Sequence, residues 1–204
     1  MTRIISGFAG SRTIRVPRGG TRPTSDRVRE AAFSALAARD ALAGATVLDL
    51  YAGSGALGLE AASRGAAAVT LVEREAAAAR LCRSNAAIVL ANAPAASTPS
   101  IIVQKQSVMA FLTSASASFD VVFIDPPYAL SDPELAQNLQ LLAPRLTPNA
   151  IVVVERSTRS AAPTWPTGLV PDRRARYGET TLWWAEASEV PSQPRYGSQP
   201  DSVS

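Results

Sequence analysis

The chain has 204 residues, of which 47% are hydrophobic and 18% are charged. This length can bury one full core and leaves little room for a second, so we expect a single folded domain. Cys82 is the one cysteine and the sequence has no histidine. That composition excludes an intrachain disulfide and a cysteine zinc cluster, and it removes the commonest general base and metal ligand. We expect no metal site, and we expect Cys82 to pack as a small apolar residue.

No N-terminal segment joins a basic start to a long apolar run, and no apolar run reaches the length of a membrane span. The sequence therefore lacks the usual signals of export and of membrane insertion. We expect a cytoplasmic protein.

The N-terminal residues 1–23 mix short apolar pairs with glycine and arginine, which predicts a small β-hairpin ahead of the main domain. Residues 1–29 hold seven arginines against Asp26 alone, whereas the whole chain has a net charge of +3. This concentration favours an arm that binds nucleic-acid phosphates, and a merely solvated basic segment is the alternative. The candidate contacts are Arg3, Arg12, Arg15, Arg22, Thr24, Arg27 and Arg29.

A helix is expected over residues 26–38, because apolar residues recur there at helical spacing. Thr24, Ser25 and Asp26 supply candidates for its N-cap. The next apolar run, at 45–50, predicts a buried strand.

That strand runs into a glycine turn that opens a helix. Gly53, Gly55 and Gly58 have the spacing G-x-G-x-x-G, and such glycines let the backbone approach a ligand while the first helical N–H groups face it. A further strand at 68–72 ends at Glu73, at the distance where an acidic residue contacts the ribose of a nucleotide-like cofactor. Dinucleotide-binding enzymes share this turn, so it does not identify the cofactor by itself.

Another apolar run, at 119–124, predicts a buried strand that ends at Asp125, Pro126, Pro127 and Tyr128. The two prolines remove two backbone donors and stiffen the chain, which leaves a carboxylate and nearby carbonyls as acceptors beside one aromatic ring. Such a socket suits a flat group that carries an NH2. It also lies where the active sites of open α/β sheets gather. A plain proline turn is the alternative for these four residues taken alone.

The remaining elements continue an alternation of strands and helices. We expect a loop at 91–99, strands at 100–103 and 150–154, a helix at 133–142, final strands near 168–176 and 180–185, and a disordered tail at 187–204. The alternation predicts an α/β fold, with a mainly parallel sheet covered by helices on both faces.

The glycine turn, Glu73 and the segment 125–128, in this order, resemble the class I S-adenosylmethionine-dependent methyltransferases of exocyclic base amines. At the N-terminus, the segments 3–7 and 22–30 narrow the resemblance to the ribosomal small-subunit methyltransferase D family, which it matches over roughly residues 3–186. The resemblance implies a Rossmann-like fold with a seven-stranded sheet. We expect the chain to consist of a basic arm at 1–23, a methyltransferase domain at 24–186 and a disordered tail at 187–204.

The resemblance also implies S-adenosylmethionine as cofactor and the N2 amine of a guanine in 16S ribosomal RNA as methyl acceptor. The catalytic residues it implies are Asp125, Pro126, Pro127 and Tyr128. The cofactor-binding residues it implies are Asp49, Tyr51, Ala52, Gly53, Ser54, Gly55, Glu73, Ser107 and Asp125. Many members have Asp or Asn at the position of Ser107, so a hydroxyl or a backbone contact is expected to hold the adenine here. We expect the substrate to be a small-subunit assembly particle and the enzyme to be a monomer.

Three alternatives stay open. The socket does not by itself separate guanine N2 from adenine N6, so an adenine-N6 nucleic-acid methyltransferase is the nearest competitor. A nicotinamide-dependent dehydrogenase would share the glycine turn and Glu73, but it would leave the socket and the arginine arm unexplained. A non-catalytic RNA-binding module would explain the arm and not the cofactor motif.

Overall fold

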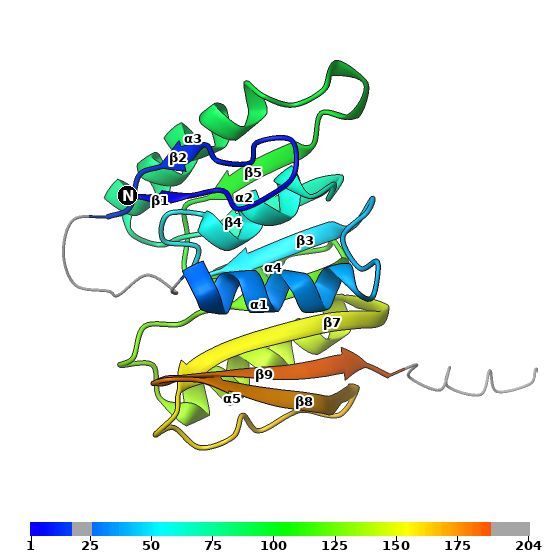
Figure 1. The fold of residues 1–204 in the computed structure, drawn as a ribbon. Coiled ribbons are helices and arrows are strands. Elements are labelled where there is room, and N and C mark those ends of the chain that lie inside the picture. The colour runs from blue at the N-terminus through cyan, green and yellow to red at the C-terminus, as the bar shows by residue number, and fades with distance from the viewer. Residues whose placement is uncertain (18–25, 189–204) are drawn as a thin grey trace, which may run out of the picture.

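The computed structural model describes residues 1–17 and 26–188. Its main feature is a seven-stranded sheet in the order β5-β4-β3-β6-β7-β9-β8, which runs from β5 at the top of Figure 1 to β8 at the bottom. The strands are β3 (Thr46–Leu50), β4 (Ala68–Val72), β5 (Ser100–Gln104), β6 (Phe119–Ile124), β7 (Leu146–Ser157), β8 (Leu169–Tyr177) and β9 (Thr180–Ala187). Strands β3 to β7 are parallel, and β9 pairs antiparallel with both β7 and β8. The expected mainly parallel, seven-stranded sheet is confirmed.

Helices cover both faces of the sheet. One core joins the sheet to α1 (Asp26–Ala37), α2 (Ala56–Ser63) and α3 (Ala76–Leu90), and the other joins it to α4 (Val108–Ser114) and α5 (Asp132–Leu142). The apolar run of each central strand feeds both cores alternately, since successive side chains point to opposite faces. In the described part of the chain, no helix combines the length and the apolar character that a membrane crossing requires.

Most expected elements occur within a few residues of their predicted bounds. Strand β7 is longer than the expected 150–154, and the expected loop at 91–99 contains a short 3-10 helix at Ala95–Ser97. Ala187 belongs to β9, so the tail expected from that residue begins too early. The rest of the tail, and the N-cap candidates Thr24 and Ser25, lie outside the described residues.

The expected N-terminal hairpin is present as β1 (Thr2–Arg3) and β2 (Thr13–Ile14), which pair antiparallel. It packs on the domain, because Ile4 and Ile14 are fully buried in the same core as α1, α2 and α3. Apolar burial therefore fixes the first residues of the chain to the main domain.

Buried polar side chains add a second attachment of the hairpin. Glu60 on α2 accepts the backbone N–H groups of Ile5 and Ser6 at 2.6 and 3.0 Å. Asn85 on α3 accepts from the Arg15 backbone N–H at 3.0 Å and donates to the Arg15 carbonyl at 2.8 Å. Glu60 and Asn85 are fully buried, so these bonds are shielded from water.

Close contact between α2 and the sheet depends on Gly58. A Cβ at this position would lie 2.3 Å from Leu71 Cδ2 and 2.9 Å from Val69 Cγ1. The Gly58 N–H also donates to Asp49 Oδ2 at 2.8 Å. A larger residue would push the helix away from the strand that carries Asp49.

We predict that Gly58→Val lowers the free energy of unfolding by about 2–3 kcal/mol, the usual cost of overpacking a core. Urea denaturation measures this change. The control is Ala37→Val at an exposed position of α1, which should change stability by less than about 1 kcal/mol. Equal effects of the two substitutions would contradict close packing at Gly58.

Candidate functional site

Four parallel strands end in register at one edge of the sheet. Leu50 of β3 pairs with Val72 of β4 and with Ile124 of β6. Ile124 in turn pairs with Val154 of β7. The four residues that follow these positions in the chain are Tyr51, Glu73, Asp125 and Glu155. Parallel pairing thus brings one tyrosine and three carboxylates to the same carboxyl edge of the sheet.

A cleft of about 690 Å³ opens at this edge. Its walls include most of the residues expected to bind cofactor or substrate: Asp49, Tyr51, Ala52, Gly53, Ser54, Glu73, Asp125, Pro126, Pro127 and Tyr128. The chain leaves β3 toward β4 on one side and later returns to β6 on the other. This reversal of strand order is the place where open α/β sheets bind ligands.

The glycine turn after β3 presents backbone to the cleft. Tyr51, Gly53 and Gly55 have φ angles of 64°, 56° and 79°, in the left-handed region. The Gly53 N–H donates to Glu73 Oε2 at 2.9 Å, and the Gly53 carbonyl accepts from the Cys82 thiol at 3.1 Å. Cys82 is fully buried, as expected. These contacts fix the turn. Because Gly53 has no side chain, its backbone can come close to a ligand.

Asp49 of β3 is an almost fully buried carboxylate in the cleft wall. Its side chain is 1% exposed, and its Oδ1 has no hydrogen-bond partner among the described residues. Burial, with repulsion from Asp125 and Glu73, outweighs the hydrogen bond from Gly58 and raises the pKa of the Asp49 carboxyl to about 7. An unsatisfied carboxylate oxygen in a cleft wall is suited to a cationic or hydrogen-bond-donating part of a ligand.

Two other residues of the strand-end row are held in place by hydrogen bonds. Glu73 Oε1 accepts the Glu75 N–H at 2.7 Å, so both carboxylate oxygens of Glu73 brace the surrounding loops. The Tyr51 hydroxyl accepts from Asn138 Nδ2 at 2.7 Å. Burial raises the pKa of Tyr51, which keeps this hydroxyl neutral.

The socket after β6 combines a braced backbone with an open ring. Pro126 is buried, Asp125 is half-buried and Pro127 is exposed. The side chain of Tyr128 is 68% exposed. A large exposed ring beside a half-buried carboxylate leaves an aromatic face on which a flat ring can stack.

Two residues expected to bind the cofactor are not in the cleft wall. Ser107 is exposed, and its hydroxyl caps α4 by accepting the Ala110 N–H at 3.2 Å. Its neighbours Gln106 and Val108 do line the cleft. Gly55 is the N-cap of α2 and packs toward Leu59 and Leu71 instead of the cleft.

The N-terminal segment contributes to the cleft wall and carries exposed arginines. Val16 and Pro17, which follow β2, are part of the cleft wall. The arginines in the described part of this segment that reach solvent are Arg3, Arg12, Arg15 and Arg27.

Arg29 differs from these residues and corrects one expectation. Its side chain is 1% exposed, and its Nη2 donates to the Arg3 carbonyl at 2.5 Å and to the Asp26 carboxylate at 3.0 Å. A buried and paired guanidinium ties the hairpin to α1 and is a poor phosphate ligand, so Arg29 is removed from the candidate RNA contacts. Arg22 and Thr24 lie outside the described residues.

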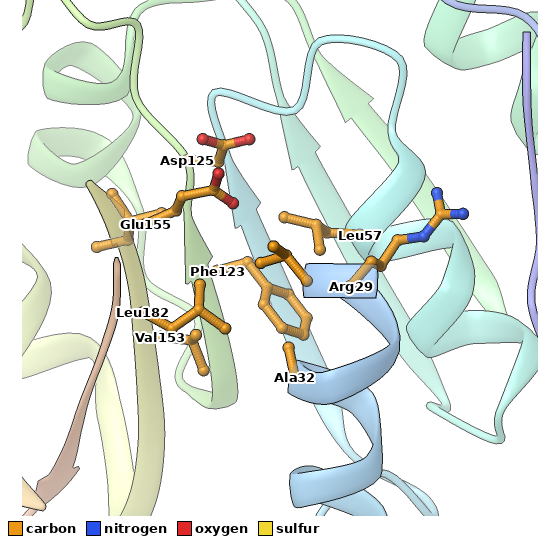
Figure 2. A pocket seen from close by; sticks show the side chains of 10 residues that line it. Arg29, Ala32, Leu57, Phe123, Asp125, Val153, Glu155 and Leu182 are labelled. Carbon is orange, nitrogen blue, oxygen red and sulfur yellow. The ribbon is translucent and has the colours of Figure 1, made fainter. Parts of the chain in front are cut away.

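Motif reasoning missed several polar residues of the cleft wall, among them Arg74, Gln106, Glu155 and Arg156. A signal for Glu155 existed, because it follows the apolar run 150–154 just as Asp125 follows 119–124. Figure 2 shows the two carboxylates at neighbouring strand ends, beyond Phe123 and Val153. Arg156 points to the other face, where it donates to the Asp132 carboxylate at 2.7 Å.

Known proteins share this architecture and much of this sequence. Residues 2–186 match the family model described as Conserved hypothetical protein 95. The Escherichia coli K12 protein named ribosomal RNA small subunit methyltransferase D is 38% identical over 165 residues, which cover 80% of this chain and 79% of that protein. The Haemophilus influenzae protein of the same name is 36% identical over 156 residues, which cover 75% of this chain and 77% of that protein.

Solved structures agree with the sequence matches. The yhhF structure from Escherichia coli superposes with a TM-score of 0.78 at 32% identity, covering 91% of this chain and 97% of that chain. The magnesium protoporphyrin IX methyltransferase of Synechocystis PCC 6803 superposes with a TM-score of 0.62 at 18% identity, covering 79% of each chain, which shows a shared fold. The chain therefore belongs to the Conserved hypothetical protein 95 family, together with the ribosomal small-subunit methyltransferase D proteins.

Proposed function

We propose that this protein transfers the methyl group of S-adenosylmethionine to the exocyclic N2 amine of a guanine in 16S ribosomal RNA. The observation that carries the proposal is the socket at 125–128, which opens into the same cleft as the glycine turn and Glu73. Family membership supports the class of substrate, because the curated relatives are small-subunit ribosomal RNA methyltransferases by name.

The cleft residues fit S-adenosylmethionine. Asp49 Oδ1, for which the described part of the chain offers no hydrogen-bond partner, is suited to a positively charged part of the cofactor, and the Glu73 carboxylate is suited to its ribose hydroxyls. Gly53 allows backbone to approach the methionine portion. Gln106 and Val108 replace Ser107 in our proposal as the residues beside the adenine. When bound, the cofactor supplies a methyl group activated by its sulfonium.

The socket residues then hold the amine for transfer. Guanine N2 is a poor nucleophile, because its lone pair is delocalised into the ring. Hydrogen bonds from the amine to the Asp125 carboxylate and the Pro126 carbonyl favour a more tetrahedral nitrogen, whose lone pair is available. The Tyr128 ring stacks on the base and fixes its plane. Holding the amine in line with the methyl group lowers the barrier further.

The N-terminal segment supplies the RNA contact in this proposal. Arg3, Arg12 and Arg15 are exposed, and the chain after β2 forms part of the cleft wall, so backbone phosphates can be bound close to the socket. An amine within a base pair cannot reach the socket, so the target nucleotide is unpaired or turned outward. A small-subunit assembly particle supplies such a nucleotide with fixed surroundings, and we propose it as the substrate of a monomeric enzyme.

We predict that affinity for S-adenosylmethionine rises with pH because of Asp49. A cationic ligand favours the ionised carboxylate. Because the pKa of Asp49 is about 7, binding below that pH requires the carboxyl to release a proton. Calorimetry should show affinity increasing by up to about tenfold from pH 6 to pH 8. Asp49→Asn, which keeps an acceptor for Gly58, should lose most of this increase, and an identical pH profile in both proteins would count against Asp49.

The same carboxyl should affect the stability of the unliganded protein. Its pKa is higher in the folded state than the usual 3.8, so the folded state holds a proton that the unfolded state has released between about pH 4 and pH 7. The free energy of unfolding should therefore fall as pH rises through this range, because Asp49 must lose its proton in the folded protein. Urea denaturation of the wild type and Asp49→Asn at several pH values measures the difference.

We predict that the exposed arginines determine the salt dependence of RNA binding. Reversing charge with Arg12→Glu and Arg15→Glu should weaken binding and reduce the slope of log K against log salt by about 0.7–0.9 for each phosphate that is no longer neutralised. Affinity for S-adenosylmethionine should be unchanged. Arg39→Gln is the control, because Arg39 is ion-paired with Asp172 and Glu186. A slope unaffected by both reversals would argue against the arm.

We predict that Asp125→Ala lowers the single-turnover rate of methyl transfer by about two to three orders of magnitude, the effect of removing one well-placed electrostatic group. Tyr128→Phe should keep most of the rate, because stacking needs the ring and not the hydroxyl. The assay uses small-subunit particles at saturating cofactor, with product nucleosides identified by mass spectrometry. Wild-type enzyme should give N2-methylguanosine, and N6-methyladenosine would refute the proposed function. A near-normal rate for Asp125→Ala would remove its carboxylate from the mechanism.

A further inference from the structure

Two carboxylates, not one, lie where the target base would enter. Ile124 and Val154 are paired across β6 and β7, and the next residues are Asp125 and Glu155. Both line the cleft that also contains Pro126, Pro127 and Tyr128. Neighbouring strands are about 4.8 Å apart, so the two side chains start from adjacent backbone positions.

The two side chains also point to the same face of the sheet. Phe123 and Val153, two residues earlier on each strand, both belong to the core beneath α1. Side chains two positions apart on a strand share a face. Figure 2 agrees, since Asp125 and Glu155 lie together above Phe123, Val153 and Leu182. The two carboxylates therefore lie on one face of the sheet, where a single ligand group can reach both.

We propose that Glu155 selects guanine, by accepting a hydrogen bond from its N1–H while Asp125 accepts one from its N2 amine. This assignment rests on the proposed function and adds to it a residue that decides which base is accepted. The socket at 125–128 alone recognises an amine beside a ring, which both guanine and adenine offer.

The chemistry of the two bases separates them at this position. The pairing edge of guanine presents two neighbouring donors, N1–H and N2–H. Adenine presents a donor, N6–H, next to an acceptor, N1. A carboxylate is an acceptor only, so it hydrogen-bonds guanine N1–H and repels the lone pair of adenine N1. A carboxylate that the bound base covers and leaves without a partner is penalised, so adenine is disfavoured.

Strand pairing and a hydrogen bond hold Glu155 in a fixed position. It lies within β7, which pairs with β6 on one side and with β9 on the other. Its Oε1 accepts from the Thr180 hydroxyl at 3.4 Å. A carboxylate offers about four acceptor positions, so it can accept from this hydroxyl and from a base together. The side chain is half-buried, which strengthens its hydrogen bonds relative to bulk water.

Asp49 Oδ1, which has no hydrogen-bond partner among the described residues, supports a ligand site in this cleft. Asp49 is 1% exposed and lines the same cleft. It lies on β3, on the cofactor side, whereas Glu155 lies on β7, beyond Asp125. Across the sheet, the order of strands therefore places cofactor contacts, amine contact and base-selecting contact in sequence.

The test compares guanine with 2,6-diaminopurine at the target position of a reconstituted small-subunit particle, after the site has been mapped with wild-type enzyme. 2,6-Diaminopurine keeps the N2 amine but has an acceptor at N1. Wild-type enzyme should prefer guanine. Glu155→Gln replaces the charged acceptor of guanine N1–H by a neutral amide, and its amide N–H can donate to N1 of 2,6-diaminopurine. The substitution should therefore lower kcat/KM on guanine by about 5- to 150-fold and reduce or invert the preference. Glu186→Gln, on β9 and outside the cleft wall, is the matched control and should keep the wild-type preference.

Thermal unfolding and calorimetric binding of S-adenosylmethionine accompany the assay, and both should be unchanged in Glu155→Gln. A loss of rate that is equal for both bases would overturn the proposal, because it would mean that Glu155 only supports the sheet. An unchanged preference for guanine would also overturn it. The proposed function fails separately: it is refuted if wild-type enzyme forms no N2-methylguanosine, whatever Glu155→Gln does, and the assignment of Glu155 falls with it.

Discussion

Parallel pairing in register is the constraint on which the site depends. The ends of β4, β3, β6 and β7 are aligned by their backbone hydrogen bonds, so Glu73, Tyr51, Asp125 and Glu155 form one row at the carboxyl edge of the sheet. A shift of one residue in any of these pairings would turn a row member to the opposite face. Fully buried apolar strands prevent such a shift, because it would also move Val47, Val121 and their neighbours out of one core and into the other.

A second constraint fixes the basic N-terminal segment. Apolar burial of Ile4 and Ile14, and the hydrogen bonds of Glu60, Ser63 and Asn85, hold this segment on α2 and α3. The exposed arginines of this segment therefore sit on backbone that is already fixed to the domain. Binding loses less conformational entropy when charged groups are fixed in this way than when they lie on a free tail.

The cleft is acidic, although the chain as a whole is basic. Carboxylates near the cofactor position suit a cationic sulfonium, and carboxylates near the base position suit the N–H donors of guanine. Arg156 of the cleft wall is ion-paired with Asp132, so its charge is compensated. In the proposed function, the two kinds of electrostatic recognition are separate: phosphates are bound at the surface, and the hydrogen-bond donors of cofactor and base are bound in the cleft.

Local sequence patterns were enough for the fold and for most of the cleft. Apolar runs predicted the strands, and the glycine turn, Glu73 and residues 125–128 were recognisable because each follows a strand directly. Other features depend on contacts between distant segments, which no local pattern contains. Arg29 resembles Arg27 in its local sequence, and it is buried where its guanidinium donates to the Arg3 carbonyl of β1. The Ser107 hydroxyl caps α4 by accepting the Ala110 N–H. Glu155 comes to lie beside Asp125 only when β7 pairs with β6.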